Sequence, residues 1–143
     1  MIKVGRINIV GILYDLYLYE NEFEQLNKDS RERDERYNIK KEDPTQNIDG
    51  YCDYSSKEIR VFIDKYTSSD YFEMTLRHEV THAFLYEIGN TNCNNEEFVD
   101  KISKWVPQIH TITNQGMGMI RHARSKKEQR SKKTDQQSIP RSE

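Results

Sequence analysis

The segment 78–82, with the sequence His-Glu-Val-Thr-His, holds the side chains best suited to chemistry. Histidines four residues apart lie on one face of a helix, so their imidazoles can bind the same metal ion. A glutamate directly after the first histidine can lie beside that ion and take a proton from a metal-bound water. The pattern therefore predicts a zinc centre with His78 and His82 as ligands and Glu79 as general base. The competing interpretation is an amphipathic helix with two surface histidines that bind nothing.

The surrounding residues favour a helix. Cap-type residues 67–70 precede the pattern, the run 71–88 contains neither proline nor glycine, and Gly89 followed by Asn90 can end a helix in the left-handed conformation. Apolar side chains at spacings of three and four provide one face for the core; they are Phe72, Leu76, Val80, Ala83 and Phe84. The histidines fall beside this face, at the margin of the core.

A catalytic zinc ion usually has three protein ligands and an open position, so a third ligand is expected downstream. Asn94 as N-cap, with Glu97 three residues later, predicts a second helix that runs to about Trp105. Helices joined by a short turn lie side by side, so Glu96 can reach the metal. Asp100 can accept the outer N–H of a ligating histidine. Glu97 and Asp100 stay open as ligands in place of Glu96, and an ordinary capped helix start is the simpler alternative.

These two segments together resemble a known family. The pattern at 78–82, followed by Asn-Glu-Glu-Phe-Val-Asp at 95–100, resembles the Glu-zincin metallopeptidases, whose second motif reads N-E-x-x-x-D. The context 75–85, with Gly-Tyr-Cys-Asp at 50–53 before it, is similar to small phage and mobile-element proteins related to ImmA/IrrE-type metallopeptidases. The specific part of this resemblance is confined to residues 75–100.

The resemblance implies a zinc-dependent endopeptidase that cleaves a protein partner, such as a repressor. Its zinc ligands would be His78, His82 and Glu96, with Glu79 as general base and Asp100 as the support of the first histidine. An oxyanion donor is also needed, and the unranked candidates for it are His110, Tyr86 and Tyr54.

Some features depart from related groups. Only thirteen residues separate His82 from Glu96, fewer than in the large Glu-zincins. Leu85 stands where a metzincin carries Gly, which excludes that group. The segment 82–86 is also similar to SprT-like DNA-associated proteases, but those carry a His where this chain has Asn94. A non-catalytic zinc-binding interaction domain and a DNA-associated protease are therefore the alternative functions.

Composition is that of one small domain. The chain has 143 residues, of which 34% are hydrophobic and 32% charged, so its core must draw on few elements. Cys52 and Cys93 lack C-x-x-C spacing and are expected to be free thiols. Neither a signal peptide nor a membrane span is visible, which favours the cytoplasm of a bacterium or an infected host.

The remaining elements are expected to form a small antiparallel sheet. Residues 7–19 suit a strand, with a helix as the alternative. Residues 50–64 suit a hairpin that turns at Ser55 and Ser56. The charged segment 28–48 is interpreted as a solvated insertion or, alternatively, a lid. In the zincins that the chain resembles, a strand before the metal-binding helix pairs with extended substrate, and residues 59–63 occupy that place. The expected fold is an α+β, minimal zincin-like domain whose sheet packs on the two helices.

Charge divides the chain. Residues 121–143 contain 8 Lys/Arg and 3 Asp/Glu, a net charge of +5, whereas residues 1–120 contain 14 and 21, a net charge of −7. The expected division is a zincin-like domain at 1–120 and a disordered basic tail at 121–143. Nucleic acid would bind through this tail only, because the body is acidic.

Overall fold

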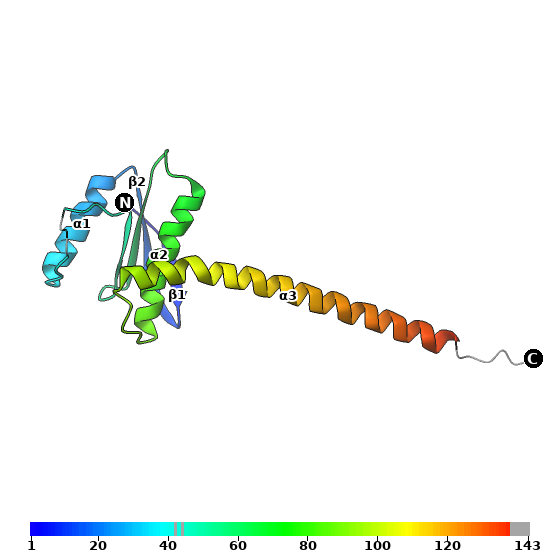
Figure 1. Ribbon diagram of the computed structural model, residues 1–143. Helices are drawn as coiled ribbons and strands as arrows, with labels where there is room; N and C mark the ends of the chain where they lie inside the picture. Colours follow the sequence, from blue (N-terminus) through cyan, green and yellow to red (C-terminus); the bar gives the residue numbers. More distant parts are fainter. Residues whose placement is uncertain (42, 44, 138–143) are drawn as a thin grey trace, which may run out of the picture. The chain divides into compact units, whose positions relative to one another are not determined.

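A computed structural model describes residues 1–41, 43 and 45–137 (Figure 1). Its elements, in chain order, are β1 (Ile2–Ile9), β2 (Ile12–Glu20), α1 (Phe23–Arg36), β3 (Gly50–Asp53), β4 (Glu58–Ile63), α2 (Ser69–Glu87) and α3 (Glu96–Gln137). The chain divides into two compact units, Met1–Lys104 and Trp105–Glu143, called here the first and second units.

The first unit contains a four-stranded sheet in the order β1-β2-β4-β3. β1 pairs with β2, and β4 with β3, in antiparallel fashion, but β2 and β4 are parallel. The α+β class is therefore confirmed, and the prediction of an antiparallel sheet is wrong at its centre. The reason is α1, because a helical crossover between β2 and the β3–β4 hairpin is the kind of connection that parallel neighbours require.

The N-terminal segment forms two strands rather than the single strand predicted at 7–19. Val10 and Gly11 join β1 to β2, and both have positive φ angles, of 52° and 88°. Two successive left-handed residues make the tight turn that matches the twist of a hairpin. The prediction missed this turn because valine rarely adopts such a conformation.

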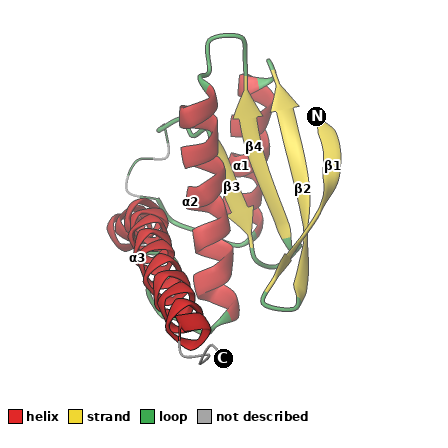
Figure 2. Cartoon of the chain, turned by 90° about the vertical axis from the view of Figure 1, so that its right-hand side faces the viewer, coloured by secondary structure: helices red, strands yellow, loops and turns green. Residues whose placement is uncertain are grey.

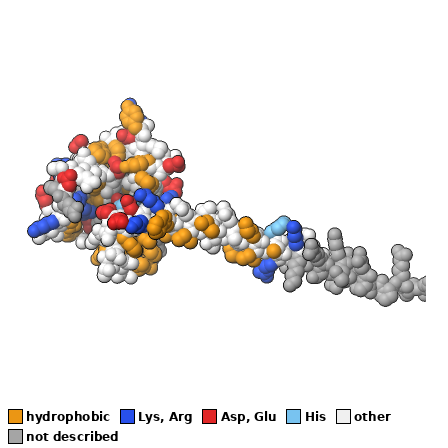
Figure 3. Space-filling view, viewed as in Figure 1, with side chains coloured by type: hydrophobic (Ala, Val, Ile, Leu, Met, Phe, Trp, Pro, Cys, Tyr) orange, Lys and Arg blue, Asp and Glu red, His pale blue; other side chains and the backbone are white. Residues whose placement is uncertain are grey.

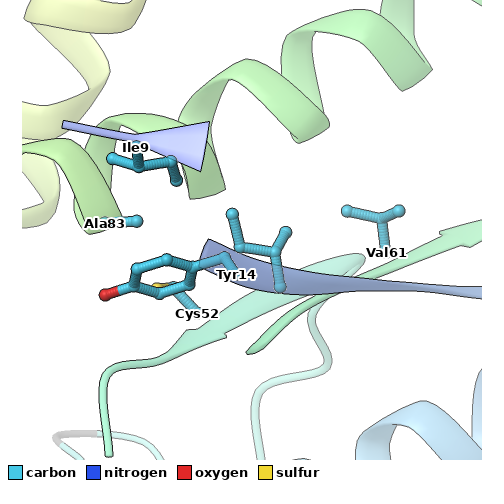
Figure 4. Packing of buried hydrophobic residues seen from close by; sticks show 6 residues of the cluster. Ile9, Tyr14, Cys52, Val61 and Ala83 are labelled. Atoms are coloured by element: carbon cyan, nitrogen blue, oxygen red, sulfur yellow. The ribbon is translucent and has the colours of Figure 1, made fainter. Parts of the chain in front are cut away.

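The two faces of the sheet are covered by different helices (Figure 2). Toward α2, the buried residues Ile9, Tyr14, Cys52, Ile59, Val61 and Ala83 pack together (Figure 4). Toward α1, the buried cluster consists of Tyr19, Leu26 and Tyr51. Successive residues of a strand point to opposite faces, so β2 and β3 contribute to both clusters.

The prediction of a solvated insertion at 28–48 is wrong for its first part, because α1 extends to Arg36 and packs on the sheet. The buried side of α1 includes the polar residues Asn27, Ser30 and Asp34, so no apolar periodicity revealed it. Asn27 is satisfied by hydrogen bonds with both the N–H and the carbonyl of Ile48. Residues 28–36 do not form a lid over the histidines, since α1 and α2 cover opposite faces.

Helix α3 continues far beyond Trp105, where the sequence predicts its end, and it contains Pro107. It also includes residues 121–137, for which the sequence predicts disorder. Residues 119–137 contain neither glycine nor proline and are rich in good helix formers, which explains the difference. The last part of the predicted tail, residues 138–143, lies outside the described residues.

The second unit is described only as helix, and the large hydrophobic side chains described there are exposed (Figure 3). They include Trp105, Ile109, Ile112 and Ile120, which recur at helical spacing. Among the described residues, no helix is both long enough and apolar enough to cross a membrane.

Candidate metal centre

Helix α2 positions the segment 78–82. Ser68 caps it, with its Oγ accepting a hydrogen bond from the N–H of Tyr71 at 3.2 Å. At the other end, Gly89 has a φ of 72°, and the N–H of Asn90 bonds to the carbonyl of Leu85 at 2.8 Å. The predicted helix and its C-terminal stop are confirmed.

The two histidines of α2 face each other. His78 Nε2 lies 2.9 Å from His82 Nε2, and the rings are 4.7 Å apart between centroids. His82 is buried, whereas 20% of the His78 side chain is exposed. One turn of helix thus brings two ring nitrogens to one point at the edge of the core.

Glu96 completes this cluster from the start of α3. Its Oε2 lies 3.0 Å from His78 Nε2 and 3.4 Å from His82 Nε2. One ligand atom from each of the three residues lies within 4.8 Å of the other two. Glu97 is turned away and pairs with Lys101 at 2.5 Å, so the structure brings together Glu96, and not Glu97, with the histidines.

The residue at which α3 begins explains which carboxylates lie near the two histidines. Asn95, rather than the predicted Asn94, caps the helix, with its Oδ1 accepting the N–H of Phe98 at 3.0 Å. Val99 is fully buried and packs with Leu85 and Cys93, which fixes the first turn of α3 against α2. Asp100 follows Glu96 by one turn, so both carboxylates lie on the same side of the helix.

The outer nitrogens of both rings meet acceptors. His78 Nδ1 lies 2.9 Å from Asp100 Oδ1, and His82 Nδ1 lies 2.6 Å from the carbonyl oxygen of Cys93. A carbonyl and an ionised carboxylate only accept hydrogen bonds, so each Nδ1 must carry the proton. In a neutral ring protonated at Nδ1, Nε2 carries a lone pair. The Nε2 lone pairs of His78 and His82 therefore converge with the Oε2 atom of Glu96.

The charges of the cluster favour a cation. Hydrogen bonds with His78 and His82 hold the pKa of Glu96 well below its usual range, despite partial burial. The hydrogen bond to Glu96 is also the main cause of a raised pKa at His78. Burial lowers the pKa of His82, but Glu96 and Glu79 together raise it above its ordinary value. The three ligand atoms therefore require a positive charge between them, either a proton or a metal ion.

Glu79 lies behind this cluster in the core. Its side chain is buried, and burial raises its pKa to about 7. Strand β3 approaches it closely at Gly50, where an added Cβ would lie 3.1 Å from Glu79 Cγ and 3.2 Å from Thr75 Cγ2. A larger residue at position 50 would require these neighbours to shift by a few tenths of an ångström, so glycine favours this close approach, a role that sequence analysis did not assign to it.

The three predicted oxyanion donors lie in different settings. The Tyr54 hydroxyl donates to the Cys93 carbonyl at 3.1 Å, on the Nδ1 side of His82. Tyr86 stacks on the Tyr54 ring, with 4.3 Å between centroids. His110 belongs to the second unit, where its Nε2 lies 3.1 Å from the side-chain nitrogen of Asn114. The described contacts thus show none of the three in the role of oxyanion donor.

Cys93 is the contact that sequence analysis missed, because its backbone carbonyl, and not its thiol, takes part. Every residue has a backbone carbonyl, so the residue type at position 93 gives no indication that this one contacts His82. Both cysteines are free, as expected, and the structure shows that both are buried.

In comparisons with known proteins, no protein-family model, curated protein sequence or solved structure matches this chain. The function must therefore be argued from the geometry of the site.

Proposed function

We propose that the first unit is a zinc-dependent peptidase whose metal is held by His78, His82 and Glu96. The observation that carries this proposal is the convergence of two imidazole lone pairs and one carboxylate oxygen, with both outer nitrogens held by acceptors. A structural histidine pair would gain nothing from directing two lone pairs at each other.

The donor set fits zinc better than the harder cations. Two imidazole nitrogens and one carboxylate form the three-ligand set of catalytic zinc, which leaves one position for water or substrate. Calcium and magnesium prefer oxygen ligands throughout. When bound, the zinc ion would polarise the scissile carbonyl and lower the pKa of a water molecule.

Glu79 is the proton carrier in this proposal. A carboxyl with a pKa of about 7 can both accept and return a proton near neutral pH, which is what general acid–base catalysis requires. It would take a proton from the attacking water and pass it to the leaving amine. Gly50 of β3 lies close against its side chain.

The substrate-binding strand must be reassigned. Residues 59–63 were expected to pair with extended substrate, but β4 already pairs with β2 on one side and β3 on the other. β3 is one of the two edge strands of the sheet, and it contacts α2. We therefore place an extended peptide along β3, next to the cluster. One backbone acceptor of this strand, the Cys52 carbonyl, already receives a hydrogen bond from Arg33 at 2.9 Å. A regulatory protein such as a repressor is the substrate that the resemblance implies.

Glu79→Gln tests the catalytic role. The variant removes the proton carrier and keeps all three ligands, so we expect it to retain zinc and fold while hydrolysis of an unstructured protein falls by about 10² to 10⁴. Glu73→Gln, a change on the same helix at an exposed residue paired with Arg77, is the matched control and should cleave normally. Undiminished hydrolysis by Glu79→Gln would contradict the mechanism.

A non-catalytic zinc-binding domain is the second candidate. It is favoured by the position of the Tyr54 hydroxyl, which is directed at Cys93 instead of at the open side of the cluster. In that case the wild-type protein would bind zinc and hydrolyse none of a broad set of peptides.

A further inference from the structure

Tyr54 lies directly after β3, in the turn of the β3–β4 hairpin, and it reaches across to the metal centre. Its hydroxyl donates to the Cys93 carbonyl at 3.1 Å and lies 3.4 Å from His82 Nδ1. That nitrogen points away from the cluster, because Nε2 of the same ring faces His78 and Glu96. The hydroxyl therefore lies on the side of His82 that faces away from the cluster.

The Cys93 carbonyl receives two hydrogen bonds, one from the Tyr54 hydroxyl and one from His82 Nδ1 at 2.6 Å. A carbonyl oxygen has two lone pairs, so it can accept both. The phenol occupies one of them and holds the oxygen where the imidazole N–H needs it.

The two histidines differ in how their outer partners are held. Asp100 carries a full negative charge, which attracts the N–H of His78 without further help. The partner of His82 is a neutral carbonyl in the loop between α2 and α3. Such a carbonyl orients the ring only if another contact keeps it in place.

Tyr54 is itself well anchored. Its ring stacks on Tyr86, one turn after His82 on α2, with an interplanar angle of 2°. Lys57 Nζ lies 4.8 Å from the centroid of the Tyr86 ring and pairs with Glu87 at 2.5 Å. The β3–β4 hairpin is thus linked to α2 and, through Cys93, to the loop that leads to Glu96.

We propose that Tyr54 is a positioning residue of the metal centre, which orients His82 through the Cys93 carbonyl so that Nε2 faces the metal. This inference rests on the proposed function, because it requires that His82 binds a metal ion. It also replaces the expectation that Tyr54 stabilises an oxyanion.

Tyr54→Phe tests the proposal, because it keeps the stacked ring and removes only the hydroxyl. Loss of a group that orients a metal ligand typically costs 10- to 100-fold in affinity, so chelator competition should show zinc binding weakened by about that factor. Tyr86→Phe is the matched control, since the structure describes no hydrogen bond of its hydroxyl. It should bind zinc as the wild type does.

Two further readouts separate positioning from stability. The absorption spectrum of the cobalt-loaded protein should change in Tyr54→Phe and not in Tyr86→Phe, because it reports the ligand geometry of the folded state. In the zinc-loaded wild type, long-range ¹H–¹⁵N NMR should place the proton of His82 on Nδ1 and the metal on Nε2. The reverse assignment would overturn the inference even if the Tyr54→Phe variant failed to fold.

The outcomes distinguish this inference from the function beneath it. Zinc binding by the wild type, with equal affinity and an equal cobalt spectrum in Tyr54→Phe, would overturn the inference alone. A wild-type protein that binds no zinc would overturn both.

Discussion

The candidate metal centre has two halves that differ in burial. The α2 half supplies His82 and Glu79, both 7% exposed, and His78 beside them. The α3 half supplies Glu96 and Asp100, whose side chains are 74% and 51% exposed. The candidate ligand atoms of the two halves lie within 4.8 Å of one another, yet only the α2 half is enclosed by the core.

This difference indicates a division of roles. The α2 half is positioned by packing against the sheet, so its geometry should persist without metal. The α3 half is held by the packing of Val99 and Phe98 and by its attraction to the histidines. We expect the exposed carboxylates to contribute to metal affinity and little to the stability of the metal-free fold.

The largest effect on zinc binding is expected when a ligand of either half is removed singly. His82→Ala and Glu96→Ala should each weaken zinc binding by more than the approximately 100-fold that an outer partner contributes. The stability of the chelator-treated proteins should differ, because Glu96 is exposed and ion pairs at the surface contribute about 1 kcal/mol or less. Urea unfolding should show a clear loss for His82→Ala only. Equal losses would break the distinction between the halves.

The buried Glu79 should make the metal-free protein sensitive to pH. Its pKa rises from 4.5 to about 7 on folding, so the folded state binds this proton more tightly than the unfolded state. The stability it contributes is fully present below about pH 4.5 and is lost as pH rises through 7, a change on the order of 3 kcal/mol.

Glu79→Gln should remove this pH dependence. Without metal, the variant should therefore be more stable than the wild type at pH 8, and the two should converge near pH 5. Urea titrations at both pH values measure the effect. An unchanged difference between the proteins across that range would show that Glu79 is not desolvated in the metal-free fold.

Asp100 tests whether the exposed α3 half contributes to zinc affinity through a residue that is not itself a ligand. Asp100→Ala removes the acceptor of the His78 Nδ1 proton, so zinc affinity should fall by about 10- to 100-fold, equivalent to about 1.4–2.7 kcal/mol. Glu97→Ala is the control, because that carboxylate pairs with Lys101 instead. A larger effect of Glu97→Ala would mean that the ligand assignment in α3 is wrong.

The smallest effect is expected from the end of α3. Removing residues 121–143 takes away eight Lys/Arg residues but no residue of the cluster. Zinc affinity should stay unchanged, and the stability of the first unit should change by no more than about 0.5 kcal/mol. If the full chain binds DNA with an affinity that falls steeply with salt, and the shortened chain does not, the basic segment is a nucleic-acid site.

The α2 half of the site could be predicted from the sequence because its signals are local. The spacing of His78 and His82, the capping residues before them and Gly89 after them all act within one helix. Glu96 and Asp100 were foreseen as well, although the choice between Glu96 and Glu97 depended on where α3 begins. A shift of the cap from Asn94 to Asn95 leaves Glu96 in place, and the burial of Val99 sets the register.

Non-local features could not be predicted. The parallel pairing of β2 with β4 depends on α1, whose buried side is too polar to show a hydrophobic period. The contact between Gly50 and Glu79 joins residues 29 positions apart, and the Cys93 carbonyl has no side-chain signature. Such features arise from tertiary packing, which a pattern along one segment does not contain.

Zinc titration of the chelator-treated wild-type protein by calorimetry tests the central claim most directly. We predict one zinc ion per chain and no binding at the same concentrations by a His78→Ala/His82→Ala double variant. A wild-type protein that binds no zinc, or a double variant that still binds it, would contradict the assignment of His78, His82 and Glu96 as a metal centre.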